Sequence, residues 1–218
     1  CGAPAPCPSL RNGYVTFGCL NDFRKINDTV LELWAQVLNA VRGSRLLVQA
    51  PLGQRRARIH QLFEKLGVPR SRVAFTNCAT RAETLQLYQQ IDIGLDTFPY
   101  GGHVSSLDSL WMGVPVVSLV GSTVAGRAGV TFAMNLQLDE LITNTPAEFV
   151  TVAHRLANDL PRLAEMRNGL RHRMQTSPLM DGVRFAKDME AAYRAVWRLW
   201  CNEASPDRSP IVMADTLQ

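Results

Sequence analysis

The sequence contains no long hydrophobic run and no closely paired cysteines. Its longest apolar stretch, residues 114–120, is far shorter than the roughly 20 residues that a membrane-spanning helix needs. We therefore expect no transmembrane helix. The five cysteines are odd in number and lack C-x-x-C spacing, which argues against a structural zinc site and favours reduced thiols in a cytoplasmic protein; they are Cys1, Cys7, Cys19, Cys78 and Cys201.

The chain also lacks an initial methionine and a signal peptide. It begins at Cys1, and its first ten residues have neither a basic lead nor an apolar core. Because residues 1–12 are rich in proline and small side chains, we expect a linker from an absent upstream domain. Residues 203–218 contain two prolines and no helical period, so we expect a disordered tail. The chain is therefore interpreted as the C-terminal segment of a larger protein.

Concentrated charge is missing as well. The net charge is +4, from 23 basic and 19 acidic residues, and the densest basic cluster spans only residues 54–58, at the start of an amphipathic helix. A nucleic-acid-binding surface requires clustered basic residues with exposed aromatic side chains. We therefore expect no nucleic-acid partner. The mild positive surplus suits either a small polyanionic ligand or an ordinary solvated surface.

Short apolar segments do alternate with helical periodicity. The pattern predicts strands at residues 14–19, 45–50, 73–76, 93–95 and 114–119, with helices near 28–38, 55–66, 82–90 and 105–112 between them. Only helices are predicted later, starting near Thr145, Pro161 and Asp181. Such repeated units indicate an α/β domain over residues 13–202, a Rossmann-like parallel sheet with helices on both faces, followed by C-terminal helices.

The last predicted helix carries an apolar stripe with helical spacing. Its members recur every three or four residues, which is typical of a face packed in a core rather than of a ligand site; they are Phe185, Met189, Tyr193, Val196 and Trp200. We therefore expect this stripe to be buried.

Three polar loops follow predicted strands, at residues 21–25, 76–81 and 96–108. In open parallel sheets, ligands bind beyond the carboxyl ends of the strands. In the third loop, Gly102 allows close backbone approach, and the next helix starts with Ser105 and Ser106, whose hydroxyls and free amides suit a diphosphate. Asp108 suits a sugar hydroxyl instead. The alternative is that both serines cap the helix and Asp108 supports its dipole.

Lys25 and His103 are the candidate catalytic residues. Lys25 precedes a predicted helix cap and can neutralise a departing diphosphate, although an isolated lysine is more often a solvated surface residue. His103 can donate to a phosphate or sugar oxygen, although a single histidine is more often structural. The other three histidines lie on predicted helices without partners and receive no role.

Two motifs resemble the O-linked N-acetylglucosamine transferase (SPINDLY-like) family. The segment FGCLNDFRKIN, followed by Leu33 and Trp34, is similar to the family pattern F-x-x-x-N-x-x-x-K-I…W. The segment GHVSSLDSLWMGVP, residues 102–115, is similar to G-H-T-T-x-x-D-x-L-W-x-G-x-P. Further matches lie at residues 72–75, 95–97, 121–127 and 177–179. The resemblance extends from about residue 13 to residue 200.

The resemblance implies a GT-B glycosyltransferase with two Rossmann-like lobes, of which this chain is the C-terminal, donor-binding one. The family binds a UDP-sugar without a metal ion or other cofactor and transfers the sugar with inversion to Ser or Thr hydroxyls of proteins. UDP-N-acetylglucosamine is the expected donor. The family's acceptor-side histidine lies in an N-terminal lobe, usually preceded by tetratricopeptide repeats. We therefore expect those parts in the same polypeptide, and no turnover by this fragment alone.

The resemblance also implies residue roles. Lys25 matches the lysine that contacts the diphosphate, while His103 and Ser105 match the start of the phosphate-binding helix. Asp108 matches the ribose-binding aspartate. The remaining predicted donor-binding positions are Asn21, Asp22, Ala79, Arg81, Thr84, Gly102, Val104 and Ser106.

Several of these positions depart from the family pattern. Val104 replaces the first threonine of the pair and removes one hydroxyl donor, and Ser106 is a candidate for partial compensation. Thr84 stands where animal members have a uracil-stacking histidine. Asp22 replaces a glutamine near the donor, and Arg81 replaces a lysine in the segment that, with Ala79, holds uridine. These departures leave uracil stacking and the identity of the sugar open.

Two alternatives to this activity remain. One is a non-catalytic nucleotide-binding or scaffolding module attached to tetratricopeptide repeats, favoured by the Val104 and Thr84 departures. The other is a different GT-B enzyme, such as a sugar-nucleotide epimerase. The sequence does not identify the sugar, the acceptor protein or the oligomeric state.

Overall fold

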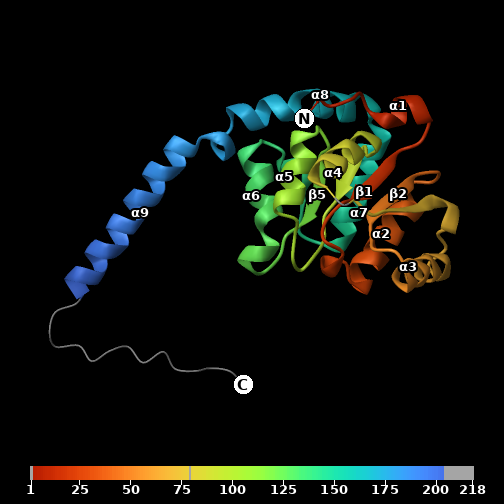
Figure 1. Cartoon of the computed structure of the whole chain (residues 1–218), viewed down its shortest axis with the longest axis horizontal. Helices are drawn as coiled ribbons and strands as arrows, with labels where there is room; N and C mark the ends of the chain where they lie inside the picture. The colour runs from red at the N-terminus through yellow and green to blue at the C-terminus, as the bar shows by residue number, and fades with distance from the viewer. Residues whose placement is uncertain (1, 79, 204–218) are drawn as a thin grey trace, which may run out of the picture. The chain divides into compact units, whose positions relative to one another are not determined.

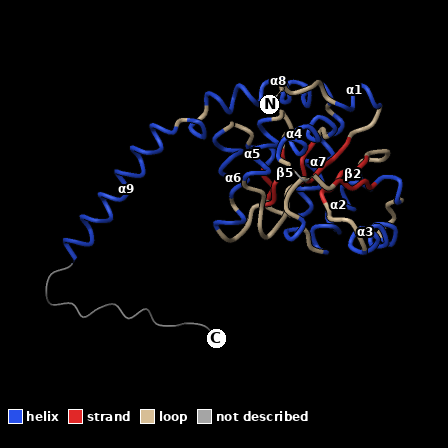
Figure 2. The backbone as a smooth tube through the Cα atoms, viewed as in Figure 1, coloured by secondary structure: helices blue, strands red, loops and turns tan. Residues whose placement is uncertain are grey.

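Six short apolar segments form a parallel sheet in the order β3-β2-β1-β4-β5-β6 (Figures 1 and 2). The computed structural model describes residues 2–78 and 80–203. Strands buried on both faces are nearly continuous in apolar residues, which is why the sequence pattern located five of the six. The strands are β1 Thr16–Cys19, β2 Arg45–Gln49, β3 Val73–Thr76, β4 Ile93–Leu95, β5 Val116–Leu119 and β6 Ile142–Thr143.

Helices cover both faces of this sheet, which confirms the predicted α/β architecture. Right-handed crossovers place α2 and α3 on one face and α4, α5 and α6 on the other, while α7 packs against α2. The chain divides into two units, residues 1–179 and 180–218. The first unit contains α1 Pro8–Asn12, α2 Asp28–Ala40, α3 Gln54–Lys65, α4 Arg81–Leu87, α5 Val104–Trp111, α6 Ala128–Asn135, α7 Pro146–Asn158 and α8 Leu160–Thr176; the second contains α9 Gly182–Glu203.

Side-chain caps begin several of these helices. Asn27 accepts a hydrogen bond from the Val30 amide at 2.9 Å at the start of α2. Thr145 accepts one from the Glu148 amide at 3.1 Å at the start of α7. Such caps satisfy amides that have no acceptor within the helix. The predicted starts of α2 and α7 are confirmed.

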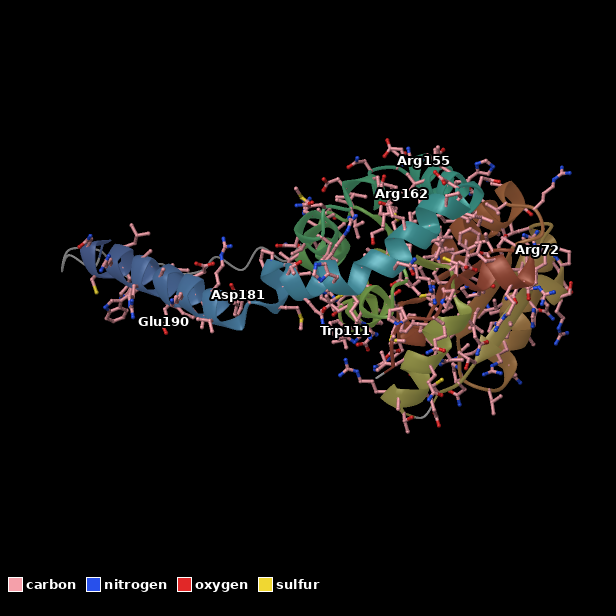
Figure 3. The ribbon with its side chains drawn as sticks, turned by 90° about the horizontal axis from the view of Figure 1, so that it is seen from above. Arg72, Trp111, Arg155, Arg162, Asp181 and Glu190 are labelled. Atoms are coloured by element: carbon pink, nitrogen blue, oxygen red, sulfur yellow. The ribbon has the colours of Figure 1, made fainter. Side chains whose placement is uncertain are left out.

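In the first unit, large apolar core side chains are accompanied by arginines that bind backbone carbonyls. Trp34 and Phe149 are fully buried. Arg72 (Figure 3) donates to the carbonyls of Leu38, Val41 and Ser44, which joins the end of α2 to the loop before β2. The guanidinium thereby supplies hydrogen-bond donors to backbone carbonyls of both segments.

Arg167 is fully buried, with an exposed fraction of 0%. Its guanidinium donates to the carbonyls of Ala5 at 2.6 Å, Ile91 at 2.6 Å and Tyr88 at 3.1 Å. The first of these bonds joins the N-terminal segment at Ala5 to α8. The interpretation of residues 1–12 as a linker stays a prediction.

Two glycines face each other where the sheet changes direction. The register pairs Gly18 of β1 with Gly94 of β4. A Cβ atom at Gly18 would overlap the buried Ile91 side chain, and one at Gly94 would lie 3.0 Å from Val116 Cγ2. A side chain at Gly18 would therefore require Ile91 to move, and one at Gly94 would require Val116 to shift slightly.

The apolar stripe of α9 contradicts the sequence-based expectation. Asp181 caps the helix as predicted, accepting from the Arg184 amide at 2.9 Å (Figure 3). The stripe, however, is not in a core. Met189 is half-buried, and the other four members have exposed fractions of 63–69%: Phe185, Tyr193, Val196 and Trp200. Helical periodicity correctly predicted one apolar face, but it does not show that this chain supplies the surface to cover it.

Smaller differences concern short elements. The pattern missed α1, α6 and β6, and it extended α4 to Gln90, whereas the α-helix ends at Leu87 and a 3₁₀ turn follows. The predicted disordered tail lies almost entirely outside the described residues. None of the described helices combines the length and apolarity needed to cross a membrane.

Candidate functional site

The loops that follow β1 and β4 lie side by side at the carboxyl edge of the sheet. Because the strand order reverses between these neighbours, this edge is the topological switch point at which open α/β sheets bind ligands. Two of the hydrogen bonds that join the loops come from Asn27 and Lys25. Asn27 Nδ2 donates to the Phe98 carbonyl at 2.8 Å, and Lys25 Nζ donates to the Gly101 carbonyl at 2.9 Å.

Lys25 therefore lies at the same edge as the predicted phosphate site. It ends the 3₁₀ turn Phe23–Lys25, and its ammonium lies 4.1 Å from the centroid of the Tyr100 ring, a cation–π distance. The Tyr100 ring is 5.4 Å from that of His103, centroid to centroid. Burial lowers the pKa of Lys25, and the nearby Asp96 carboxylate partly opposes this shift.

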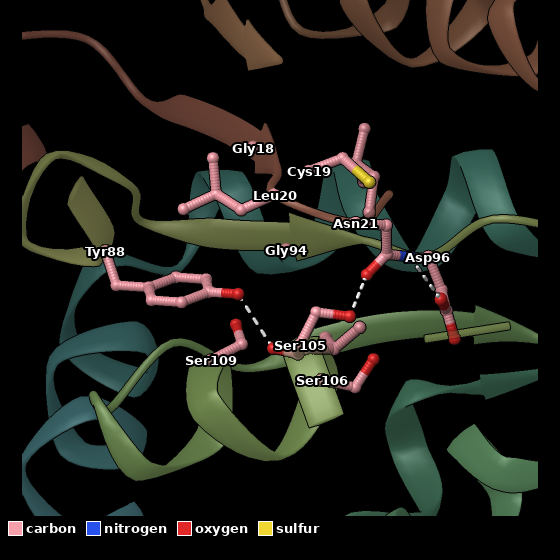
Figure 4. Close-up of a pocket in the computed structure, with 12 residues that line it drawn as sticks. Gly18, Cys19, Leu20, Asn21, Tyr88, Gly94, Asp96, Ser105, Ser106 and Ser109 are labelled. Carbon is pink, nitrogen blue, oxygen red and sulfur yellow. Dashed lines mark hydrogen bonds between the residues drawn. The ribbon is translucent and has the colours of Figure 1, made fainter. Parts of the chain in front are cut away.

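The start of α5 differs slightly from the predicted one. His103 is the N-cap, makes no side-chain capping bond, and the helix begins at Val104. Neither serine is therefore the cap. Ser105 donates its hydroxyl hydrogen bond to Asn21 Oδ1 (Figure 4), and Ser106 is buried. The first-turn amides have no acceptor within the helix, and they lie at the positive end of its dipole. This helix start can therefore bind an anion.

His103 presents an unused polar atom at this point. Its Nδ1 is buried and, within the described part of the chain, has no hydrogen-bond partner. A buried polar atom without a partner costs free energy unless a ligand or water satisfies it. Val104, beside it, is 64% exposed and offers a backbone amide but no hydroxyl.

Arg81 and Asp108 form an ion pair beside the helix start. Arg81 Nη2 lies 2.6 Å from Asp108 Oδ1. Asp108 is buried while the Arg81 side chain is 70% exposed, so the pair is open to solvent on one side. The guanidinium neutralises a carboxylate that would otherwise repel an approaching anion. Sequence analysis placed both residues near a nucleoside but did not predict that they bind each other.

The other predicted donor-binding residues are distributed around this edge. The Asp22 carboxylate accepts from the Arg24 side chain at 2.6 Å, and this pairing lowers the pKa of Asp22 to about 2. Thr84 Oγ1 donates to the Thr80 carbonyl at 3.1 Å, one turn earlier. Ala79 lies outside the described residues. Ligand contacts for all of these residues stay predictions.

Asp96, to which sequence analysis assigned no role, lies under the site. It follows β4 directly, is 4% exposed, and accepts the Gly102 amide hydrogen bond at 2.7 Å. An aspartate that comes immediately after a buried strand at the ligand edge was the available signal. Its hydrogen bonds, however, depend on loop geometry that no sequence pattern specifies.

The remaining candidate chemistry concerns metal ligands and cysteines in the described residues. No group of three or more His, Cys, Asp or Glu side chains is arranged there to hold a metal ion. Cys7, Cys19, Cys78 and Cys201 are free thiols, and burial raises the pKa of Cys19 to about 12. That thiol is therefore protonated at neutral pH and is a poor nucleophile.

Comparison with known proteins gives a consistent family. Residues 8–189 match the model of glycosyl transferase family 41. The chain is 39% identical over 209 residues to the probable UDP-N-acetylglucosamine–peptide N-acetylglucosaminyltransferase SPINDLY of Petunia hybrida, covering 94% of this chain and 22% of that protein. It is 31% identical over 190 residues to a UDP-N-acetylglucosamine–peptide N-acetylglucosaminyltransferase of Caenorhabditis elegans, covering 87% of this chain and 16% of the relative.

Solved structures show the same likeness. A mutant O-GlcNAc transferase of Thermobaculum terrenum superposes with a TM-score of 0.85 at 36% identity, covering 93% of this chain and 39% of that chain. Sucrose-phosphate synthase of Thermosynechococcus elongatus superposes with a TM-score of 0.61 at 15% identity over 90% of this chain and 50% of that one, a likeness of fold alone. The chain thus spans about a fifth of the curated relatives that it matches.

Proposed function

Because the chain belongs to glycosyl transferase family 41, we propose that it is the C-terminal, donor-binding lobe of an inverting GT-B enzyme that transfers a sugar from a UDP-sugar to Ser or Thr hydroxyls of proteins. One observation carries this proposal. The Lys25 ammonium and the amino-terminal end of α5 meet at the switch point of the sheet, joined through Gly101 and Tyr100. A cation beside a helix start is suited to a diphosphate.

In this proposal the lobe stabilises the leaving group. As the bond between the sugar and the diphosphate breaks, negative charge grows on the UDP oxygens. The α5 amides and Lys25 are fixed before the reaction, so they stabilise that charge without a cost of reorganisation. His103 Nδ1 is available to a phosphate or sugar oxygen, and Asp108, which is paired with Arg81, is the proposed ligand of the ribose hydroxyls.

The proposal requires parts of the polypeptide beyond this chain. The matched region covers only 22% and 16% of the two curated relatives, which leaves room for an N-terminal lobe with the acceptor-side groups and for tetratricopeptide repeats. UDP-N-acetylglucosamine is the proposed donor, since both curated relatives cited above carry it in their names. The free thiols agree with the proposed cytoplasmic location.

The test is transfer by the full-length polypeptide from a panel of UDP-sugars, with ADP- and GDP-sugars as controls for the base. We expect UDP-N-acetylglucosamine to be used. Lys25→Ala should lower kcat/KM by about 100-fold or more, because a cation on the leaving group is lost. Lys65→Ala, at the exposed end of α3, is the matched control and should retain wild-type kcat/KM.

Two outcomes would contradict the proposal. Full transfer activity in Lys25→Ala would remove the assigned role of the lysine. Absence of UDP binding by the intact protein in calorimetry would instead favour a non-catalytic scaffolding module. That second candidate is supported by Val104, whose exposed apolar side chain replaces a hydroxyl at the helix start.

A further inference from the structure

Asp96 is the most highly connected carboxylate of the site. Oδ1 accepts from the amides of Gly102 at 2.7 Å and Thr97 at 2.9 Å, and Oδ2 accepts from the Ser118 hydroxyl at 2.9 Å. Asn21 Nδ2 approaches Oδ1 at 3.4 Å (Figure 4). A carboxylate buried to this degree is stable only when hydrogen bonds replace its water. These bonds tie it to the loops after β1 and β4 and to β5.

Asn21 extends this arrangement toward the helix start. Its Nδ2 donates to Thr97 Oγ1 at 3.0 Å, and its Oδ1 accepts the hydrogen bond of the Ser105 hydroxyl. The carboxamide is 4% exposed, so both of its ends are used inside the protein. A chain of contacts therefore runs from Asp96 through Asn21 to Ser105.

Gly102 is closely packed against the side chains of Asn21 and Ser106. A Cβ atom there would overlap Ser106 Oγ and lie 2.8 Å from Asn21 Oδ1. The amide of Gly102 points inward to Asp96, which orients the peptide that leads to His103. The direction of the α5 start thus depends on where the Asp96 carboxylate lies.

We propose that Asp96 is a positioning residue of the donor site: through Gly102 and Asn21 it holds the loop that accepts the Lys25 hydrogen bond and the serine at the start of α5 in the arrangement that binds the diphosphate. This inference rests on the function proposed above. Asp96 itself does not contact the donor.

The experiment compares Asp96→Ala with Asp96→Asn in the full-length protein. Alanine removes every bond of the carboxylate, whereas asparagine still accepts the Gly102 and Thr97 amides on Oδ1 and can donate to the Ser118 hydroxyl. We expect Asp96→Ala to weaken UDP binding by about tenfold or more, because a displaced binding group loses most of its effect. Asp96→Asn should recover most of that affinity.

Asp92→Ala is the matched control. Asp92 lies at the other end of β4, is 0% exposed, and accepts the amides of Ser9 and Thr16, each at 2.9 Å. Both alanine variants should lower the melting temperature, but Asp92→Ala should bind UDP as the wild type does. Equal UDP affinity of folded Asp96→Ala and wild-type protein would overturn the proposal, as would an Asn variant as weak as the Ala variant.

Hydrogen exchange of residues 96–106 without nucleotide gives a readout independent of UDP. Exchange should be faster in Asp96→Ala and near wild type in Asp96→Asn; wild-type exchange in both would overturn the proposal. If wild-type protein bound no UDP, the proposed function would fail, while the exchange data would still test the positioning.

If Asp96→Ala does not fold, Ser118→Ala removes one bond to Asp96 and should accelerate the same exchange. Ser177→Ala, which removes a buried hydroxyl far along the chain, should not.

Discussion

Lys25 is half-buried between the Gly101 carbonyl and the Tyr100 ring, and this environment determines how the site responds to pH. Burial places its pKa below the usual 10.5. Only the ammonium form attracts a diphosphate, so UDP affinity should fall as pH rises through that pKa, by up to about tenfold per pH unit above it. Titrating UDP binding to the intact protein between pH 7 and 10 measures this fall.

Lys25→Arg provides the comparison, because a guanidinium stays charged over this range. Its UDP affinity should decline less steeply than that of the wild type. Deprotonation of the uracil ring affects both proteins equally and cancels in the ratio. Parallel pH profiles for the two proteins would show that Lys25 does not hold the diphosphate through its charge.

For single residues, the sequence predicted at which edge of the sheet they lie but not which side chains contact each other. Lys25, Ser105 and Asp108 follow predicted strands, so their location at one edge could be deduced from topology. The Arg81–Asp108 ion pair and the role of Asp96 could not. They depend on side-chain distances between segments that are 27 and 6 residues apart in sequence, for which local patterns carry no information.

Among the helices, α7 offers a clean test of the capping inference. Thr145→Ala removes the acceptor of the Glu148 amide and should lower the free energy of unfolding by about 1 kcal/mol. Thr151→Ala is the matched control, since Thr151 is exposed within the same helix and bonds only back to the Ala147 carbonyl. Urea denaturation of this chain measures both.

The control variant should stay within about 0.5 kcal/mol of the wild type. If the two substitutions cost the same, the cap would contribute nothing beyond an ordinary threonine side chain. The start of α7 would then be set by Pro146 and by packing against α2.

Long elements were predicted well from the sequence, and short ones were not. The start of α2 at Asp28 and the left-handed Gly67 after α3, with φ +81°, follow from capping chemistry and periodicity. The strand β6, of two residues, is too short to show any period, and α6 contains Gly129 and few polar residues to define a face. Neither left a pattern to detect.

At the scale of the whole chain, the exposed stripe of α9 should govern how the isolated protein behaves. Apolar side chains contiguous on one exposed face promote association. Replacing Trp200 of the stripe and the nearby Trp197, which are 63% and 65% exposed, with serine should therefore reduce concentration-dependent self-association. Sedimentation velocity over a dilution series of this chain provides the measurement.

The polar face of the same helix supplies the control. Lys187→Ala with Arg194→Ala changes two exposed charged side chains and leaves the apolar stripe intact, so it should leave self-association unchanged or increased. Identical sedimentation of the tryptophan variant and the wild type would mean that another surface drives association.

The glycine pair of Gly18 and Gly94 has a consequence for engineering this lobe. Ile91 blocks one partner and Val116 approaches the other, so trimming either neighbour relieves only half of the crowding. A larger residue at either glycine would therefore require neighbouring side chains to move within the paired strands β1 and β4. Variants intended to change what this edge of the sheet binds should alter the loops beyond these strands and leave both glycines unchanged.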